Sequence, residues 1–296
     1  MLDGDLWQVP AIDQHAHNLL RPEIVEANPY GASFTEGIDP ALVGHHARHT
    51  FFYRRSLRDI AALLECEPEE RAILVRRGEL GTERLAALCF ERSKLDMVFL
   101  DDGLLHEKAF PLDWHGCFLP VRRILRLEYA AEQLIRDSDG RETDGFEHFI
   151  ERFLGEIDPP PHEVVAFKSI AAYRSGLRID CAPDGPAARA AFDRIRRTAG
   201  SSSFRLTEKA LIDYLLVHAL RVASRRAIPV QFHTGFGDPD LDLRLANPLH
   251  LRPLLEEKQW HRAPVVLLHA GYPFVKEAGH LASVYPQVYV DFGLAI

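Results

Sequence analysis

Cysteine is scarce in this sequence, and none of the four cysteines forms a C-x-x-C pair: Cys66, Cys89, Cys117 and Cys181. A chain of 296 residues can bury a sizeable core without disulfides, so we expect four reduced thiols and no zinc knuckle. Residues 1–7 contain no basic segment followed by an apolar one, and no apolar run reaches the length of a membrane span. These absences predict a cytoplasmic protein with no membrane partner.

Basic residues are outnumbered by acidic ones, 35 against 43, which gives a net charge of −8. Nucleic-acid binding depends on basic patches, so a nucleic-acid partner is disfavoured. The sequence also has no P-loop, no G-x-G-x-x-G and no G-x-S-x-G motif, so nucleotide binding and serine hydrolysis have no support. With 47% hydrophobic and 26% charged residues, the composition is that of an ordinary globular protein, and the expected partner is a small-molecule substrate.

Seven short apolar runs predict buried strands, because each is bounded by glycine, proline or charge. They are 9–13, 97–100, 122–127, 164–167, 230–232, 265–268 and 288–291. Helical patterns lie between them, the clearest at 207–224 with Thr207 as its N-cap. Strands that alternate with helices predict a parallel sheet, and right-handed crossovers would wind seven such units into most of an α/β barrel.

The long gap after the first strand predicts an insertion. Residues 18–95 contain helical patterns at 40–49, 57–64, 67–77 and 82–94, which we interpret as a helical insertion over the barrel mouth. A second interruption covers 184–203 and ends in the run AGSSS. Neither segment resembles an independent domain, so residues 1–296 are predicted to form a single barrel domain.

Four histidines and one lysine stand at the ends of apolar runs: His15, His17, Lys168, His233 and His269. The ends of parallel barrel strands meet at one edge, where the active site lies. His15 and His17 are two apart on a predicted strand and share its face with Asp13, which would orient a histidine by hydrogen bonding. Neutral imidazoles suit a divalent metal, with zinc favoured and manganese or iron also suited.

The pattern resembles the amidohydrolase superfamily, in particular the amidohydrolase-2 type of domain that occurs alone or fused to glutamine-synthetase-like domains. Five segments spanning nearly the whole chain carry the resemblance: AIDQHAHN at 11–18, FKSIAAYRSG at 167–176, FHTGFG at 232–237, LHAGYP at 268–273 and VYVDFG at 288–293. The resemblance implies a TIM-type (β/α)8 barrel of the metal-dependent hydrolase kind. In that family an H-x-H pair closes strand 1, a lysine can close strand 4, histidines close strands 5 and 6, and an aspartate closes strand 8.

By resemblance, His15, His17 and His233 would be metal ligands, and His269 would ligate a second metal or polarise the substrate. Lys168 has three interpretations that the sequence leaves open. It would be a carbamylated ligand that bridges two metals, an ammonium that binds an anionic substrate, or a lysine paired with a rim carboxylate. His269 and Lys168 are therefore the expected catalytic residues, and one or two ions are expected.

The sequence departs from the family pattern after the seventh strand. Ile296 follows soon after that strand, so the last βα unit and its aspartate, which is both ligand and general base in the family, are expected to be missing. Asp291 is expected to belong to strand 7 rather than to replace that base. The chain would then be a truncated chain, a fragment or a degenerate member, with an open seam that a homo-oligomer or a fused or partner domain would cover.

Four weaker features complete the candidate site. Arg174 suits a carboxylate clamp, although a surface arginine fits the pattern nearly as well. Tyr272 would line the pocket or pack against other aromatics. His45 and His49 have i, i+4 spacing but are interpreted as a solvated or lid face. Residues 238–242 are interpreted as a loop that covers the substrate, because the glycine and glutamate of a calcium loop are missing.

The leading hypothesis is a metal-dependent hydrolase that acts on an amide or other C–N bond of a small polar substrate through a metal-activated water. A metal-dependent decarboxylase or other lyase of the same fold is the first alternative. A catalytically inactive binding or scaffolding domain is the second, because the strand-8 aspartate is absent. Two bound ions favour the hydrolase, whereas a single ion with an unmodified Lys168 leaves the lyase open.

Overall fold

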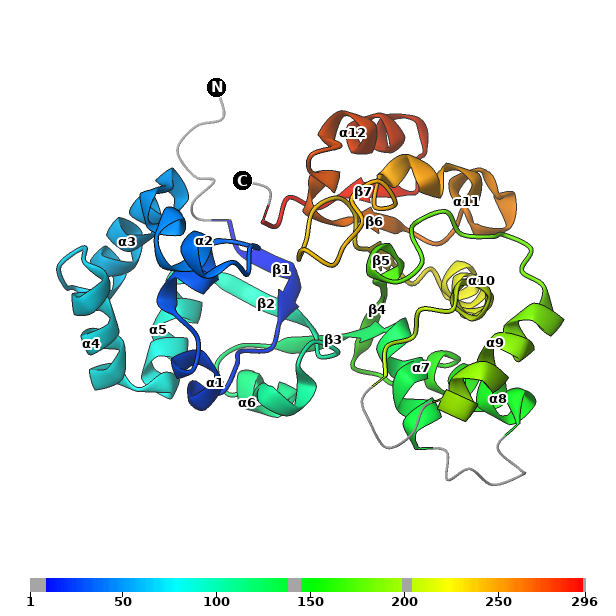
Figure 1. The fold of residues 1–296 in the computed structure, drawn as a ribbon, viewed down its shortest axis with the longest axis horizontal. Coiled ribbons are helices and arrows are strands. Elements are labelled where there is room, and N and C mark those ends of the chain that lie inside the picture. The colour runs from blue at the N-terminus through cyan, green and yellow to red at the C-terminus, as the bar shows by residue number, and fades with distance from the viewer. Residues whose placement is uncertain (1–8, 138–144, 199–203, 295–296) are drawn as a thin grey trace. The chain divides into compact units, whose positions relative to one another are not determined.

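The computed structural model describes residues 9–137, 145–198 and 204–294, so residues 1–7 and the AGSSS run at 199–203 lie outside the described residues. The chain divides into two compact units, an N-terminal unit, Met1–Arg122, and a C-terminal unit, Arg123–Ile296 (Figure 1). The organisation of residues 1–296 as one domain stays a prediction.

The N-terminal unit contains a parallel pair of strands, β1 (Ala11–His17) and β2 (Leu95–Asp101). Helices fill the segment between these strands, and two more, η4 and α6, follow β2: α1 (Pro22–Glu26), η2 (Tyr30–Phe34), α2 (Pro40–Gly44), η3 (His46–His49), α3 (Phe51–Leu64), α4 (Glu70–Leu80), α5 (Thr82–Ser93), η4 (His106–Lys108) and α6 (Leu112–Gly116). Ala61, Leu64 and Ile73 form the buried centre of this helical segment. The insertion is therefore helical, and its position over a barrel mouth stays a prediction.

The expected helix at 40–49 is wrong in one respect. It ends at Gly44, and the short 3-10 turn η3 (His46–His49) follows it. Glycine weakens a helix, and His45 between the two elements has φ −125° and ψ −62°, outside the helical region. The i, i+4 relation expected for His45 and His49 is therefore not that of a continuous α-helix.

The C-terminal unit contains five parallel strands in chain order: β3 (Val121–Arg126), β4 (Val164–Ser169), β5 (Val230–Phe232), β6 (Val265–Leu267) and β7 (Val288–Val290). Helical connections join them: α7 (Leu127–Arg136), α8 (Phe146–Ile157), η5 (Ala171–Tyr173), α9 (Gly185–Thr198), α10 (Lys209–Arg226), η6 (Pro248–Leu251), α11 (Arg252–Glu256), η7 (Lys258–Trp260), η8 (Leu268–Gly271) and α12 (Val275–Val284). Figure 1 shows α10 beside β4 and β5. All seven expected strands are present, and all of them except β5 are shifted at one or both ends.

Burial on the inner side of α10 holds these layers together. Leu211, Leu216 and Leu220 of this helix are almost fully buried in one core with Phe167 of β4 and Phe232 of β5. Burying each such side chain stabilises the fold by roughly 1.5–3 kcal/mol relative to an exposed one. This packing fixes the strand ends from which the candidate site is built.

Thr207 is not the N-cap of α10. Glu208 is, because its backbone carbonyl accepts the first helical hydrogen bonds, from Leu211 N at 3.1 Å and Ile212 N at 3.0 Å.

Among the described residues, no helix is both long enough and apolar enough to cross a bilayer. Cys66, Cys89, Cys117 and Cys181 are free thiols, as expected.

Candidate metal centre

The chemistry-bearing residues of the C-terminal unit stand at the same edge of its parallel strands. Lys168 is the penultimate residue of β4, His233 directly follows β5, and Asp291 directly follows β7. His269 is two residues beyond β6, in η8. The carboxyl ends of parallel strands share one edge, which is where sites form in α/β folds.

His233 and His269 face each other. The Nδ1 atom of His233 and the Nε2 atom of His269 lie 3.1 Å apart, and both side chains are buried. The other nitrogen of each ring is held by a backbone carbonyl: His233 Nε2 lies 2.9 Å from Phe236 O, and His269 Nδ1 lies 3.0 Å from Gly293 O. A carbonyl oxygen only accepts hydrogen bonds, so these two outer nitrogens must carry the protons.

This assignment leaves a lone pair on each of the two facing nitrogens when the imidazoles are neutral. Two lone pairs 3.1 Å apart repel each other unless a proton or a metal ion lies between them. Two nitrogen ligands of a tetrahedral zinc ion, each at about 2.0–2.1 Å, would stand about 3.3 Å apart. The donor set and its separation therefore fit a divalent metal ion.

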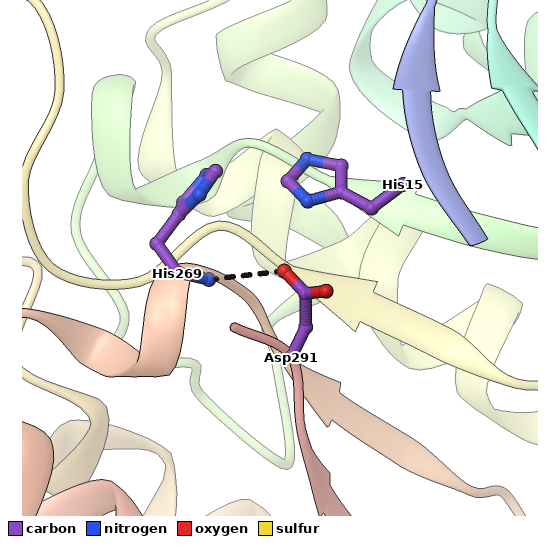
Figure 2. Close-up of side chains that lie close together, drawn as sticks. All are labelled: His15, His269 and Asp291. Carbon is purple, nitrogen blue, oxygen red and sulfur yellow. Dashed lines mark hydrogen bonds between the residues drawn. The ribbon is translucent and has the colours of Figure 1, made fainter. Parts of the chain in front are cut away.

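Asp291 adds a carboxylate to this edge. Its Oδ2 accepts hydrogen bonds from the backbone N of His269 at 3.3 Å (Figure 2) and of Gly293 at 3.2 Å. A carboxylate oxygen of Asp291 and a ring nitrogen of His269 lie within 4.8 Å of each other. Asp291 comes directly after β7, one residue beyond the strand in which the sequence predicted it.

The backbone at His269 is strained. His269 has φ 61° and the following Ala270 has φ 51°, in the left-handed region that residues with a Cβ rarely adopt. A hydrogen bond from Ala270 N to Asp291 O, 2.6 Å long, helps to hold this conformation. Such strain costs about 1–3 kcal/mol per residue and clusters at functional sites. This left-handed backbone conformation accompanies the orientation in which the His269 ring faces His233.

Gly235 lets the loops after β5 and β6 approach closely. Its φ is 74°, and a Cβ built there would overlap the carbonyl oxygen of Tyr272 and lie 2.5 Å from the carbonyl carbon of Gly271. We expect Gly235→Ala to destabilise the protein by at least about 2 kcal/mol, because both the backbone angle and the backbone contact must change. The measurement is urea unfolding.

Gly279→Ala is the matched control, because Gly279 lies within α12 and an added Cβ would meet nothing within 4 Å. Alanine there should leave stability unchanged or raise it by roughly 0.5–1 kcal/mol. Equal effects of the two substitutions would contradict the tight loop contact at Gly235.

Lys168 is buried, with 2% of its surface exposed. The next residue, Ser169, donates its hydroxyl hydrogen to Glu128 Oε1 of α7 at 2.6 Å, so Ser169 faces the helical layer. Successive strand residues face opposite sides, so Lys168 lies on the face turned away from α7, together with its register partners Arg126 and Gln231. The three interpretations of this lysine stay open.

In the N-terminal unit, the H-x-H pair belongs to β1 itself. The ring centroids of His15 and His17 are 6.1 Å apart. His17 Nδ1 lies 3.1 Å from the carbonyl oxygen of Asp101, so this nitrogen carries a proton and the lone pair of the neutral ring is on Nε2. The fully buried Asp101 carboxylate is 3.7 Å from the same nitrogen.

The sequence-based interpretation missed Asp101, although this residue ends β2 and pairs with His17 in the β1–β2 register. Asp13 instead accepts a hydrogen bond from the backbone N of His15, at 3.0 Å. β1 carries one extra residue between Asp13 and Ala16, because their partners Val98 and Leu100 are only two residues apart. Such a bulge re-aims neighbouring side chains.

The remaining candidates lie as follows. Arg174 is not a surface arginine, because its side chain is 8% exposed and its Nη2 lies 3.1 Å from Glu132 Oε1. Tyr272 is half exposed and stands edge-on to Phe236, which in turn packs against His269.

His45 and His49 are exposed, with ring centroids 4.8 Å apart, which agrees with a solvated face.

The loop at 238–242 is tied to its neighbours by ion pairs. Asp240 pairs with Arg205 at 2.6 Å, and Asp242 pairs with Arg244 at 2.8 Å. The backbone N of Asp238 donates to the hydroxyl of Tyr173 at 3.2 Å. Tyr173 was missed by the sequence analysis, although its ring centroid lies 4.6 Å from that of His233. Its position in η5, four residues beyond the end of β4, was the signal that could have identified it.

Comparison with known proteins places the chain in a family. The family model of the amidohydrolases matches residues 165–296. A crystal structure from Lactobacillus casei, assigned as a metal-dependent hydrolase, shares 30% identity and a TM-score of 0.78, covering 96% of this chain and 73% of that one. The curated protein fluG of Emericella nidulans is 31% identical over 317 residues, which are 96% of this chain but only 36% of fluG.

Uronate isomerase from Thermotoga maritima matches at the level of the fold, with 14% identity and a TM-score of 0.51, covering 97% of this chain and 76% of that one. The chain belongs to the amidohydrolase superfamily. Its described residues have the TIM-type barrel fold of the metal-dependent hydrolases without a last βα unit, which confirms the expected fold class. Membership of this family implies a divalent metal.

Proposed function

We propose that this chain is a metal-dependent hydrolase that acts on an amide or other C–N bond of a small polar substrate. The observation that carries the proposal is the pair of facing nitrogens, His233 Nδ1 and His269 Nε2, whose outer partners are carbonyl oxygens. A proton or a metal ion between the two nitrogens relieves their repulsion, and the family to which the chain belongs implies a divalent metal.

In this proposal His233 and His269 of the C-terminal unit bind the metal. The resemblance to the family adds His15 and His17 of the N-terminal unit as ligands, and Lys168 as a further ligand if it is carbamylated. The tautomers of His17, His233 and His269 support these roles, because each leaves one ring nitrogen with its lone pair. Nitrogen donors favour zinc, and manganese or iron also suit them.

A divalent ion at this site would lower the pKa of a bound water towards neutrality and polarise a carbonyl oxygen. The chain's own residues orient the two histidines and contact the substrate. The carbonyls of Phe236 and Gly293 hold the rings of His233 and His269 in one orientation. Tyr272 offers an exposed aromatic ring beside Phe236 for the substrate. Arg174 offers a buried cation for an acidic group of the substrate.

Metal content per chain, measured by elemental analysis on protein purified without chelator, tests the proposal. We expect about two ions per chain if Lys168 is carbamylated, and loss of metal in the His15→Ala/His17→Ala double variant. Hydrolysis of a panel of small amides should disappear with the metal and return when it is added back.

Three other results of the metal analysis would change the proposal. A single ion per chain, together with release of carbon dioxide from aromatic acids, would favour a lyase over the hydrolase. Well-folded protein without any metal would contradict both the hydrolase and the lyase hypotheses and would favour a binding or scaffolding domain. Retention of full metal content by the double variant would remove the H-x-H pair from the ligand set.

A further inference from the structure

Arg174 carries buried donors that nothing in the described structure satisfies. Its Nη2 pairs with Glu132 on α7, but Nε and Nη1 are buried and have no hydrogen-bond partner. A guanidinium presents five N–H donors in a rigid planar fork, and each buried donor without an acceptor destabilises the folded protein. A natural sequence retains such a group where a ligand supplies the missing acceptor.

The nearby carboxylates are already engaged. Glu132 Oε1, which binds Arg174, also accepts a hydrogen bond from the backbone N of Leu206 at 2.7 Å. Glu128 accepts from the hydroxyl of Ser169 at 2.6 Å and from the backbone N of Ile170 at 3.1 Å. These glutamates therefore fix the helix and the loop, and neither of them accepts a hydrogen bond from Nε or Nη1 of Arg174.

Ser175 is the second, independent observation. Its Oγ is also buried without a hydrogen-bond partner. Three buried side-chain atoms without a hydrogen-bond partner therefore belong to these two consecutive residues. A guanidinium and a hydroxyl can both donate to one anionic oxygen pair, so their concentration in one loop indicates a built site rather than a single packing defect.

The loop that carries them also contacts the proposed metal centre. Tyr173, the residue before Arg174, packs its ring against His233 at 4.6 Å between centroids. Its hydroxyl accepts a hydrogen bond from the backbone N of Asp238, in the loop after β5. The chain turns at Gly176, whose φ is 87°, and Leu177 then donates to the carbonyl oxygen of Leu245. Arg174 and Ser175 are thus held at the same edge of the strands as His233.

We propose that Arg174 and Ser175 form a subsite for a carboxylate group of the substrate, so that the hydrolase acts on a small amide that also bears a carboxylate. This inference rests on the proposed function and adds the charge of the substrate to it. A carboxylate accepts hydrogen bonds without donating any, so one of its oxygens can accept from Nη1 of Arg174 while the other accepts from the Ser175 hydroxyl. Burial makes the pairing stronger than it would be in water.

The test uses succinate as the probe and its neutral diamide, succinamide, as the matched control compound. Thermal melting is followed during titration of the wild-type protein, Arg174→Lys and Ser175→Ala. Succinate should raise the Tm of the wild-type protein in a saturable way, and succinamide should not. Arg174→Lys keeps a positive charge beside Glu132 but loses the fork, so we expect succinate to bind at least about 10-fold more weakly.

Ser175→Ala separates a binding role from a structural one. Without succinate its Tm should equal or exceed that of the wild-type protein, because a buried hydroxyl without a partner is removed. With succinate it should bind about 10-fold or more weakly, because a hydrogen bond to a charged group is worth about 1.5–3 kcal/mol. Arg244→Lys, at an exposed arginine paired only locally with Asp242, should behave as the wild-type protein does.

Metal-free protein, prepared with a chelator and checked by elemental analysis, is titrated in parallel. Succinate binding that requires Arg174 and persists without metal supports the subsite, even if the metal analysis contradicts the proposed hydrolase. Succinate binding that vanishes with the metal and is unchanged in Arg174→Lys would overturn the subsite and leave the hydrolase standing. Absence of any succinate effect on the wild-type protein, or an equal effect of succinamide, would also overturn it.

Discussion

His269→Ala is expected to lose its bound metal and all metal-dependent hydrolysis. The substitution removes one of the two facing nitrogens, and His233 Nδ1 alone cannot hold the ion in the C-terminal unit. Changes to residues that merely orient a ligand cost 10–100-fold in metal affinity, so loss of the ligand itself should cost at least about 100-fold. Isothermal titration of the metal-free protein with zinc measures the affinity, and hydrolysis is assayed on the same samples.

His280→Ala is the matched control, because His280 is an exposed histidine on α12 in the same unit. It should bind zinc as the wild-type protein does. Thermal melting of the metal-free proteins shows whether His269→Ala is folded. If folded His269→Ala kept its metal but lost activity, His269 would polarise the substrate rather than bind the metal. If the variant kept both its metal and its activity, the hypothesis that the two facing nitrogens bind a metal would be wrong.

Glu128→Ala is expected to destabilise the protein by about 2–6 kcal/mol. Glu128 is almost fully buried in the first turn of α7, and its two oxygens accept hydrogen bonds from the Ser169 hydroxyl and the Ile170 backbone. Alanine leaves both donors without an acceptor, at about 1–3 kcal/mol each. Urea unfolding measures the change. Glu151→Ala, at an α8 glutamate whose side chain is 79% exposed, is the control and should change stability by less than about 0.5 kcal/mol.

The pH dependence of stability gives an independent check on the same residue. Burial raises the pKa of Glu128 above its ordinary value of 4.5, and the hydrogen bonds from Ser169 and Ile170 only partly oppose this. A folded-state pKa above the unfolded one means that the contribution of Glu128 is fully present below pH 4.5 and is lost as the pH rises through the raised value.

A glutamine at position 128 cannot ionise, so the stability of the Glu128→Gln variant does not fall in this way as the pH rises. Its free energy of unfolding relative to the wild-type protein should therefore increase as the pH rises from 4.5, the ordinary glutamate value. Urea unfolding of both proteins across the pH range measures the difference. Parallel curves over the whole range would show that Glu128 titrates normally in the folded protein.

The strands were predictable because the apolar pattern of a buried strand is local. The run at 230–232 matches β5, Val230–Phe232, without any shift. The first strand was harder to delimit, because the apolar pattern stops at Asp13 while β1 continues to His17. The extra residues are only half buried and belong to the strand through their pairing with β2, for example His17 with Asp101. No local pattern reports such a pairing.

The sequence by itself determined the alternation of strands and helices, the family, and the histidines and lysine at the strand ends, since each depends on residue types at short spacing. Only the tertiary structure decided which ring nitrogen of each histidine faces a backbone carbonyl, because the deciding atoms are distant in the chain: the carbonyl of Asp101 lies 84 residues from His17, and that of Gly293 lies 24 residues from His269. It also decided that Arg174 is buried with unsatisfied donors. Burial and hydrogen-bond geometry arise when separate segments pack together, and no spacing along the chain encodes them directly.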